Sequence, residues 1–239
     1  MKSVRRTGIV VGALFIVATA ASLVGSTVLG SMLEGPDYLL DIAANENQVT
    51  WAAMLFLVAA SSAFATAFLL FPILRRHSEG LAAGYVGLRG FENVLYVAGA
   101  AALLMMLTVS QSGSAGAAGS ASLPLVGSAL LAFHNWSILI GTLIFAGWGS
   151  LTLNYVLYRS SLVPRWLSLW GIIGASLLIV YGVIGFFGVE TSLGSPFMLL
   201  AMPIALEEMV FAVWLIAKGF NRQALRSDAQ PEVRVPVMT

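Results

Sequence analysis

Residues 51–74 read WAAMLFLVAASSAFATAFLLFPIL, which is a run without one charged side chain. A bilayer core about 30 Å thick needs roughly 20 apolar residues in helical form, because every backbone N–H and C=O must be paired inside the lipid. This run is therefore long enough to cross a membrane as one helix. The whole chain has the same character: 59% of its 239 residues are apolar and 10% are charged, whereas soluble domains carry about 25% charged residues. The sequence predicts an integral membrane protein.

Further apolar stretches lie on both sides of this run. They predict an all-α bundle of six transmembrane helices, at about 8–30, 51–74, 81–109, 130–158, 166–188 and 196–217. We expect residues 1–220 to form this transmembrane domain and residues 221–239 to form a disordered cytoplasmic tail. Pro203 lies inside the last predicted span and is expected to kink it.

The basic residues indicate the orientation. Six spans place both termini on one side of the membrane, and every lysine and arginine except Arg89 falls on that side. The positive-inside rule makes this side cytoplasmic, so we expect a multi-pass protein of a bacterial inner membrane. On the opposite side, Gly35-Pro36-Asp37 and the following residues 38–44 predict a turn and a short amphipathic helix on the membrane surface.

Several classes of function lack their sequence signals. The chain has no cysteine and a net charge of only +1, which excludes disulfides and thiolate chemistry and gives no footprint for nucleic acid. A phosphate-binding loop, a zinc helix and a serine nucleophile elbow are also missing from the sequence. We predict no catalytic residue, no metal ligand and no cofactor, and the sequence favours a binding role over an enzymatic one.

A polar stripe runs along the third span. Its members are Tyr85, Arg89, Glu92, Asn93 and Tyr96, and their spacing places them on one face of a helix. At 1.5 Å per residue, the third of these lies roughly 16 Å from the cytoplasmic end, near the middle of the membrane. An ionisable group at that depth costs about 2.5–3.5 kcal/mol, so each needs a partner or a purpose.

The sixth span carries two adjacent acids, Glu207 and Glu208, at a similar predicted depth. Neighbouring helical residues point about 100° apart, and we expect Glu208 to meet Arg89 and Glu92. If all four groups were ionised, the cluster would be net negative. Such a cluster requires a protonated carboxyl, a bound cation or a water-filled cavity. The alternative is a salt bridge that only fixes the helix register.

His134, Asn135 and Trp136 lie near the outer end of the fourth span, far from the level of Arg89. A histidine beside the outer acids could form a metal site, but such a residue more often caps a helix or hydrogen-bonds across helices. The predicted ligand-binding residues are Arg89, Glu92, Asn93, Tyr96, Glu208, His134 and Asn135.

Four motifs together resemble one family. They are the stretch 75–89 continuing to Glu92, His134-Asn135-Trp136, the stretch 158–166 and the stretch 212–220. These resemble the bacterial membrane proteins known as domain of unknown function 4386, over nearly the whole chain. The resemblance implies a six-helix inner-membrane protein and implies no activity. It supports Arg89, Glu92, His134, Asn135 and Glu208, and departs from the family pattern at Ile204 and Glu207.

We therefore predict a carrier or membrane sensor that binds a proton, a cation or a small amphiphile at the Arg/Glu cluster. One alternative is a membrane-embedded enzyme that uses His134 with outer carboxylates. Another is a structural or regulatory partner of a second membrane protein. The expected partners are the lipid bilayer and this small ligand, with no nucleic acid, and a homodimer fits the small-residue stripes of the helices as well as a monomer does.

Overall fold

The computed structural model describes residues 2–114, 123–189, 191, 195–221 and 223–227, and all regular structure among these residues is helical. The α-helices are α1 (Lys2–Leu29), α2 (Tyr38–Ala44), α3 (Glu46–Leu74), α4 (Glu79–Ser114), α5 (Leu123–Ile138), α6 (Ala146–Ser160), α7 (Arg165–Phe186), α8 (Met202–Ala217) and α9 (Ala224–Ser227). A π-helical segment, Leu139–Phe145, joins α5 to α6, and a 3-10 helix, Pro196–Leu200, precedes α8.

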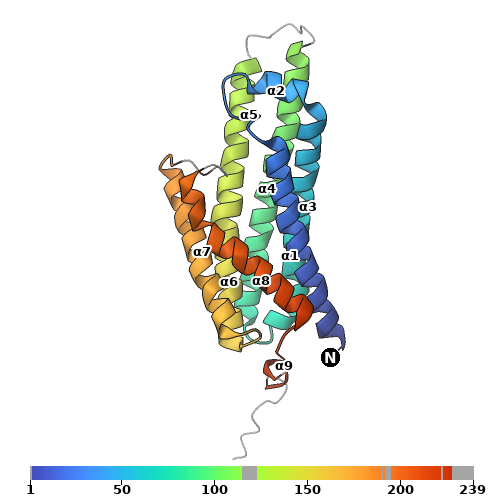
Figure 1. Ribbon diagram of the computed structural model, residues 1–239, viewed down its shortest axis with the longest axis vertical. Coiled ribbons are helices and arrows are strands. Elements are labelled where there is room, and N and C mark those ends of the chain that lie inside the picture. Colours follow the sequence, from blue (N-terminus) through green and yellow to red (C-terminus); the bar gives the residue numbers. More distant parts are fainter. Residues whose placement is uncertain (1, 115–122, 190, 192–194, 222, 228–239) are drawn as a thin grey trace, which may run out of the picture.

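Long helices form one elongated bundle (Figure 1). Five described segments are long and apolar enough to cross a membrane: Val4–Leu29, Glu46–Leu74, Glu79–Ser112, Leu123–Ser160 and Arg165–Phe186. The chain is therefore an all-helical, multi-pass membrane protein. Large apolar side chains such as Phe91, Phe68 and Val213 are exposed on the outside of the bundle, as expected for a surface that faces lipid rather than water.

The last predicted span differs from the single helix expected at 196–217. Its first part is the 3-10 helix, and α8 begins only at Met202, with Pro203 in the first helical turn. Proline is tolerated there because the first N–H groups of a helix have no intrahelical acceptor. Pro203 thus stands at the start of a helix and does not kink one. With 16 residues, α8 is too short to count among the five candidate spans, and it crosses the bundle obliquely (Figure 1).

The short helix predicted at 38–44 is α2, with these bounds. It lies across one end of the bundle (Figure 1), and Ile42 is fully buried in the core formed with α3 and α4. Leu39 packs closely against Gly127 of α5. The helix therefore covers the end of the bundle, and its place at the membrane surface stays a prediction.

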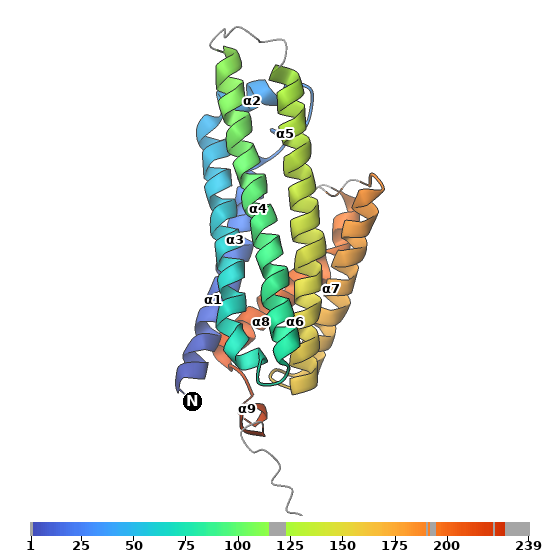
Figure 2. The ribbon, with the colours of Figure 1, turned by 180° about the vertical axis from the view of Figure 1, so that it is seen from behind.

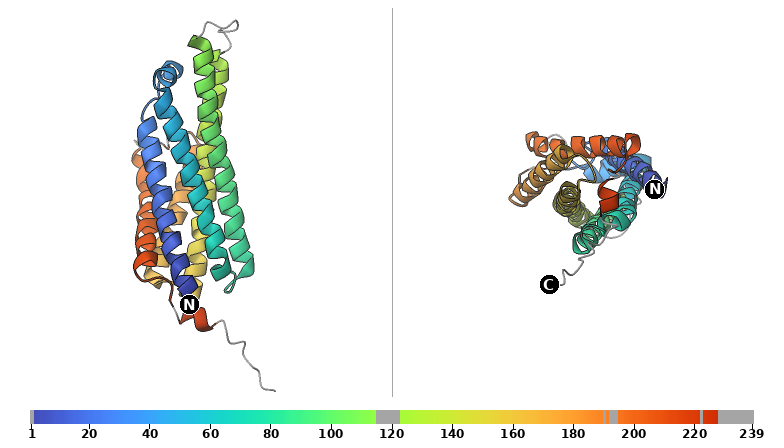
Figure 3. Two further views of the ribbon diagram at one scale, coloured as in Figure 1. Left: turned by 90° about the vertical axis from the view of Figure 1, so that its right-hand side faces the viewer. Right: turned by 90° about the horizontal axis from the view of Figure 1, so that it is seen from below.

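The N-terminus, the α3–α4 turn, the α6–α7 turn and the end of α8 all lie at the opposite end, called here the terminal end (Figures 1 and 3). Arg5 of α1 ties two of these segments together, because its guanidinium donates to the carbonyls of Leu215, Ile216 and Ala217 at 2.7, 2.6 and 3.0 Å. Of the predicted disordered tail, Ala224–Ser227 forms one helical turn, and residues 228–239 lie outside the described residues.

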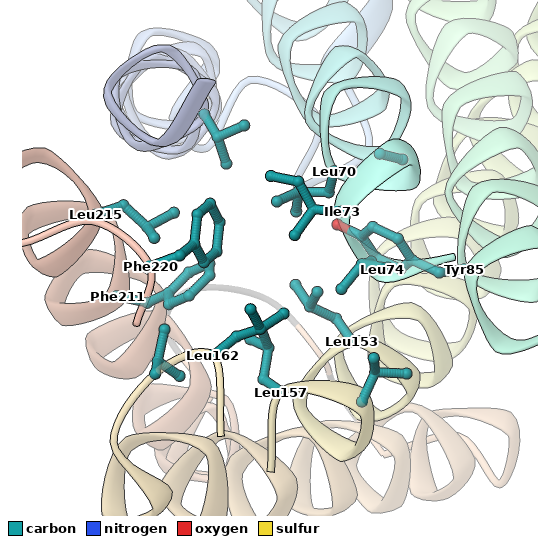
Figure 4. Packing of buried hydrophobic residues seen from close by; sticks show 14 of the residues in the cluster. Leu70, Ile73, Leu74, Tyr85, Leu153, Leu157, Leu162, Phe211, Leu215 and Phe220 are labelled. Atoms are coloured by element: carbon teal, nitrogen blue, oxygen red, sulfur yellow. The ribbon is translucent and has the colours of Figure 1, made fainter. Parts of the chain in front are cut away.

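A hydrophobic core fills the terminal end of the bundle (Figure 4). It combines side chains from seven helices, including Phe15 of α1, Leu70 of α3, Leu157 of α6 and Phe211 of α8. Gly12 brings α1 against α8, since a Cβ atom there would lie 2.5 Å from the carbonyl oxygen of Ala212. Apolar side chains therefore fill the interior of the bundle at its terminal end.

Candidate functional site

Arg89 and Glu92 form a buried ion pair on α4. The Arg89 Nη1 atom lies 3.0 Å from Glu92 Oε1 and 2.8 Å from Oε2, so one nitrogen donates to both oxygens. Only 5% of the arginine side chain and 10% of the glutamate side chain are exposed. The three-residue spacing places both groups on one helix face, as the sequence predicts.

Two further helices contribute polar groups to this pair. Arg89 Nη2 lies 3.4 Å from Glu208 Oε1 of α8, and the Ser150 hydroxyl of α6 donates to the same oxygen at 3.2 Å. The arginine side chain packs against α6 at Gly149, whose Cβ position lies 3.6 Å from Arg89 Nε, an ordinary packing distance. Arg89, Glu92, Ser150 and Glu208 are called the ion-pair cluster below. Figure 2 shows α4 beside α6, with α8 crossing the bundle.

Glu207 does not join this cluster. Its side chain is 1% exposed, and it faces Asn154 of α6. Asn154 in turn lies against the backbone of Gly171 in α7, where a Cβ atom would come within 2.2 Å of the amide carbon. Sequence reasoning identified Glu207 as a membrane-embedded acid but ranked it below Glu208, and it missed Ser150 and Asn154. The one signal in the sequence was the four-residue spacing of Ser150 and Asn154, which places both on one face of a predicted span.

A cleft of about 650 Å³ opens in the half of the bundle away from the terminal end. Its walls come from α1, α3, α4, α5, the π-helical segment, α7 and the 3-10 helix before α8. They are mainly apolar, and the polar side chains among them include Ser22, Tyr96, His134, Asn135, Thr142 and Tyr181. The hydroxyls of Ser22 and Tyr96 are 2.6 Å apart and bridge α1 to α4.

The predicted site residues therefore divide between two levels of the bundle. Arg89, Glu92 and Glu208 are brought together in the ion-pair cluster. Tyr96, His134 and Asn135 line the cleft. Since Tyr96 follows Glu92 by four residues, the two levels are about one helical turn apart. Asn93 is half-buried, and its Oδ1 has no hydrogen-bond partner among the described residues.

The π-helical segment connects the two levels. Its residues Leu139, Thr142 and Leu143 line the cleft, while a Cβ on Gly141 would lie 3.5 Å from the Glu92 carbonyl oxygen. The hydroxyl of Thr142 donates to the carbonyl of Ile138. Single π-helical turns inside α-helices are frequent at functional sites, because they shift the register of the side chains that follow. An apolar sequence run contains no signal for such a shift.

His134 is buried, and its Nδ1 lies 2.8 Å from the carbonyl oxygen of Gly99 on α4. This contact joins α5 to α4 and occupies one of the two ring nitrogens. Among the described residues, no three histidine or acidic side chains gather as metal ligands would. Glu190, one of the outer acids considered with His134, lies outside the described residues.

Comparison with known proteins places the chain in a family. No curated protein and no solved structure matches the sequence. The family described as Domain of unknown function (DUF4386) matches residues 10–219, which include the ion-pair cluster and the cleft. Because the match covers nearly the whole helical bundle, the chain belongs to the DUF4386 family.

Proposed function

We propose that this protein is a six-span carrier or sensor of the bacterial inner membrane, which binds a small amphiphile with a cationic head in the cleft. The observation that carries the proposal is the position of the cleft. It opens in the half of the bundle opposite the sealed terminal end, and its wall residue Tyr96 lies one turn from Glu92 of the ion-pair cluster.

The size and lining of the cleft suit such a ligand. Pockets for small molecules have volumes of about 300–1,000 Å³, with mostly apolar walls and a few polar groups that fix orientation. A cleft of about 650 Å³ falls in that range. The aromatic side chains of Phe56, Trp136 and Tyr181 offer apolar contact surface, and Thr142 and Ser26 offer hydroxyls.

The charges nearby favour a cation. The ion-pair cluster contains one arginine and two glutamates, so it is net negative when all three are ionised. In low dielectric this surplus attracts positive charge and repels negative charge. Glu208 retains 24% side-chain exposure, more than either residue of the Arg89–Glu92 pair. It does not line the cleft, and we assign to it the electrostatic attraction of the cationic head from the neighbouring level.

The orientation follows from the basic residues. Arg75, Arg76, Arg159 and Arg165 belong to the turns at the terminal end, and the positive-inside rule assigns that end to the cytoplasm. The 3-10 helix and α8 together make the sixth crossing of the membrane. The cleft then opens in the outer half of the membrane, and the packed core closes the inner half.

The enzyme alternative has less support from the geometry. It requires His134 to work with outer carboxylates, whereas this side chain is buried and contacts the Gly99 carbonyl. Glu34 is the one described acid that lines the cleft together with His134. We therefore prefer a binding role.

The experiment compares two hydrophobic ions of the same shape and opposite charge, tetraphenylphosphonium and tetraphenylborate. Purified protein in nanodiscs is titrated with each, and binding is measured by equilibrium dialysis. We expect saturable binding of the cation only. Ser26→Trp should abolish it by filling the cleft, whereas Val17→Trp, on the exposed face of the same helix, should not.

A second pair of variants tests the assigned charge. Glu208→Gln should weaken cation binding about tenfold or more, as expected for the loss of one low-dielectric charge contact of about 1.4 kcal/mol. Glu79→Gln, an exposed acid at the terminal end, is the control. Equal binding of both ions, or cation binding that survives Ser26→Trp, would contradict the proposal.

A further inference from the structure

Glu207 is a fully buried carboxyl without a countercharge. It is 1% exposed, and no described residue forms an ion pair with it. Arg89, the cation of this region, is already shared between Glu92 and Glu208. The Oε1 atom of Glu207 has no hydrogen-bond partner among the described residues. A bare carboxylate in such surroundings costs far more free energy than the neutral acid.

Asn154, the neighbour of Glu207, also has a side-chain oxygen without a hydrogen-bond donor among the described residues. Asn154 donates from Nδ2 to the Ser150 carbonyl at 3.1 Å, and its amide faces the carboxyl of Glu207. The Oδ1 atom of Asn154 is buried and has no partner among the described residues. Gly171 leaves room for the amide against the backbone of α7 but none for it to move further in that direction.

Two acceptor oxygens, one on each of two touching side chains, thus lack a donor. If Glu207 were ionised, these lone pairs and the charge of Glu208 would all be left to repel one another. One proton on Oε1 supplies the missing donor and removes the uncompensated charge at the same time. The neutral acid and the amide can then pair, the acid O–H donating to the amide oxygen and the amide N–H donating to the other carboxyl oxygen.

Among the described residues, no positive charge beside Glu207 could replace this proton. On α8 itself the neighbour is Glu208, which is also acidic. From α6 the group that faces Glu207 is Asn154, and α7 lies against that amide at Gly171. Arg5 of α1 contacts α8, but it donates to the carbonyls of residues 215–217 at the C-terminal end of that helix. It is therefore not a partner of Glu207.

We infer that Glu207 is a proton-binding site of the bundle, distinct from the ion-pair cluster, with Asn154 as the hydrogen-bond partner of the bound proton. Ser150 links the two sites, because its carbonyl accepts from Asn154 while its hydroxyl donates to Glu208. Release of the proton would place a second negative charge beside Glu208. It would also change the hydrogen bonds that join Asn154, Ser150 and Glu208. The site stands whether or not the cleft binds an amphiphile.

Infrared difference spectroscopy at neutral pH tests the inference directly. The carbonyl band of a neutral carboxylic acid should be present in the wild-type protein and missing in Glu207→Gln. Glu208→Gln is the matched control, because it removes the adjacent carboxyl, which contacts Arg89, and should leave the acid band in place. Asn154→Leu should retain the band and shift it towards the position of a free acid. An acid band that persists in Glu207→Gln, or that is lost in Glu208→Gln, overturns the assignment.

Thermal unfolding across a range from about pH 5 to pH 10 gives an independent readout. A carboxyl that keeps its proton in the fold but loses it on unfolding makes the wild type less stable as the pH rises. Glu207→Gln, which resembles the neutral acid in shape, should remove this decline and should equal the wild type at the acidic end. A decline of the same size in both proteins overturns the inference. So does stabilisation by sodium ions at constant pH, which would assign the site to a metal cation.

Discussion

Asn154 of α6 lies flat against Gly171 of α7: a Cβ atom on this glycine would fall 2.2 Å from Cγ of the amide and 2.3 Å from both its nitrogen and its oxygen. The absence of a side chain at residue 171 therefore creates the space in which Asn154 faces Glu207. The packing of α6 against α7 at this glycine thus fixes the position of the Asn154 amide beside Glu207.

We predict that Gly171→Ala destabilises the protein by about 1–3 kcal/mol, because the added methyl group must displace a buried amide. The measurement is the thermal unfolding midpoint in detergent. Gly87→Ala is the control, since a Cβ there meets no atom within 4 Å, and it should leave stability unchanged or raise it by about 0.5–1 kcal/mol. Equal effects of the two substitutions would show that Asn154 is free to move.

The ion pair of Arg89 and Glu92 gives a second prediction. Arg89→Gln leaves the buried Glu92 and the half-buried Glu208 without their cation, and breaking a buried pair from one side costs about 3–5 kcal/mol. The double variant Arg89→Gln/Glu92→Gln should lose less than Arg89→Gln alone, because it removes one of the stranded charges. Arg76→Gln, at an exposed arginine, should have little effect. A double variant as unstable as the sum of the two single ones would show that the two residues are not coupled.

Much of this arrangement follows from the sequence, for reasons that are local. Runs such as 51–74 are long and charge-free, so their helical form and their membrane location need no tertiary information. The three-residue spacing places Arg89 and Glu92 together in any helix, and the counted depth brings Glu208 to their level. That these residues bind a ligand stays a prediction.

The remaining features depend on how the helices pack, and no local pattern contains them. The cleft exists only where α1, α4, α5, the π-helical segment and α7 come together in the folded bundle. Ser150 and Asn154 are ordinary polar residues of an apolar run until α8 and α7 approach them. The sequence also favoured Glu208 over Glu207, whereas the geometry leaves Glu207 as the carboxyl without a cation.

Arg5 gives a third prediction, at the terminal end. Its three hydrogen bonds satisfy the last carbonyls of α8, which have no intrahelical donors. A cation also interacts favourably with the C-terminus of a helix dipole. Arg5→Gln should cost about 1–3 kcal/mol and should speed hydrogen exchange in the last turn of α8. Arg6→Gln, at the exposed neighbouring arginine, is the control, and equal exchange in both variants would contradict the capping role.

The last prediction concerns the six-span topology. Because the sequence contains no cysteine, single cysteines can be introduced and labelled without background. Single cysteines at Asp37, Phe187, Glu79 and Gln223 occupy exposed positions in four different connections. If α8 completes a sixth crossing and the basic end faces the cytoplasm, a membrane-impermeant maleimide added to intact cells should label Asp37→Cys and Phe187→Cys. Glu79→Cys and Gln223→Cys should react only after the membrane is opened. Labelling of Gln223→Cys in intact cells would mean that α8 returns to the side from which it started, and the proposed orientation of the chain after α7 would then be wrong.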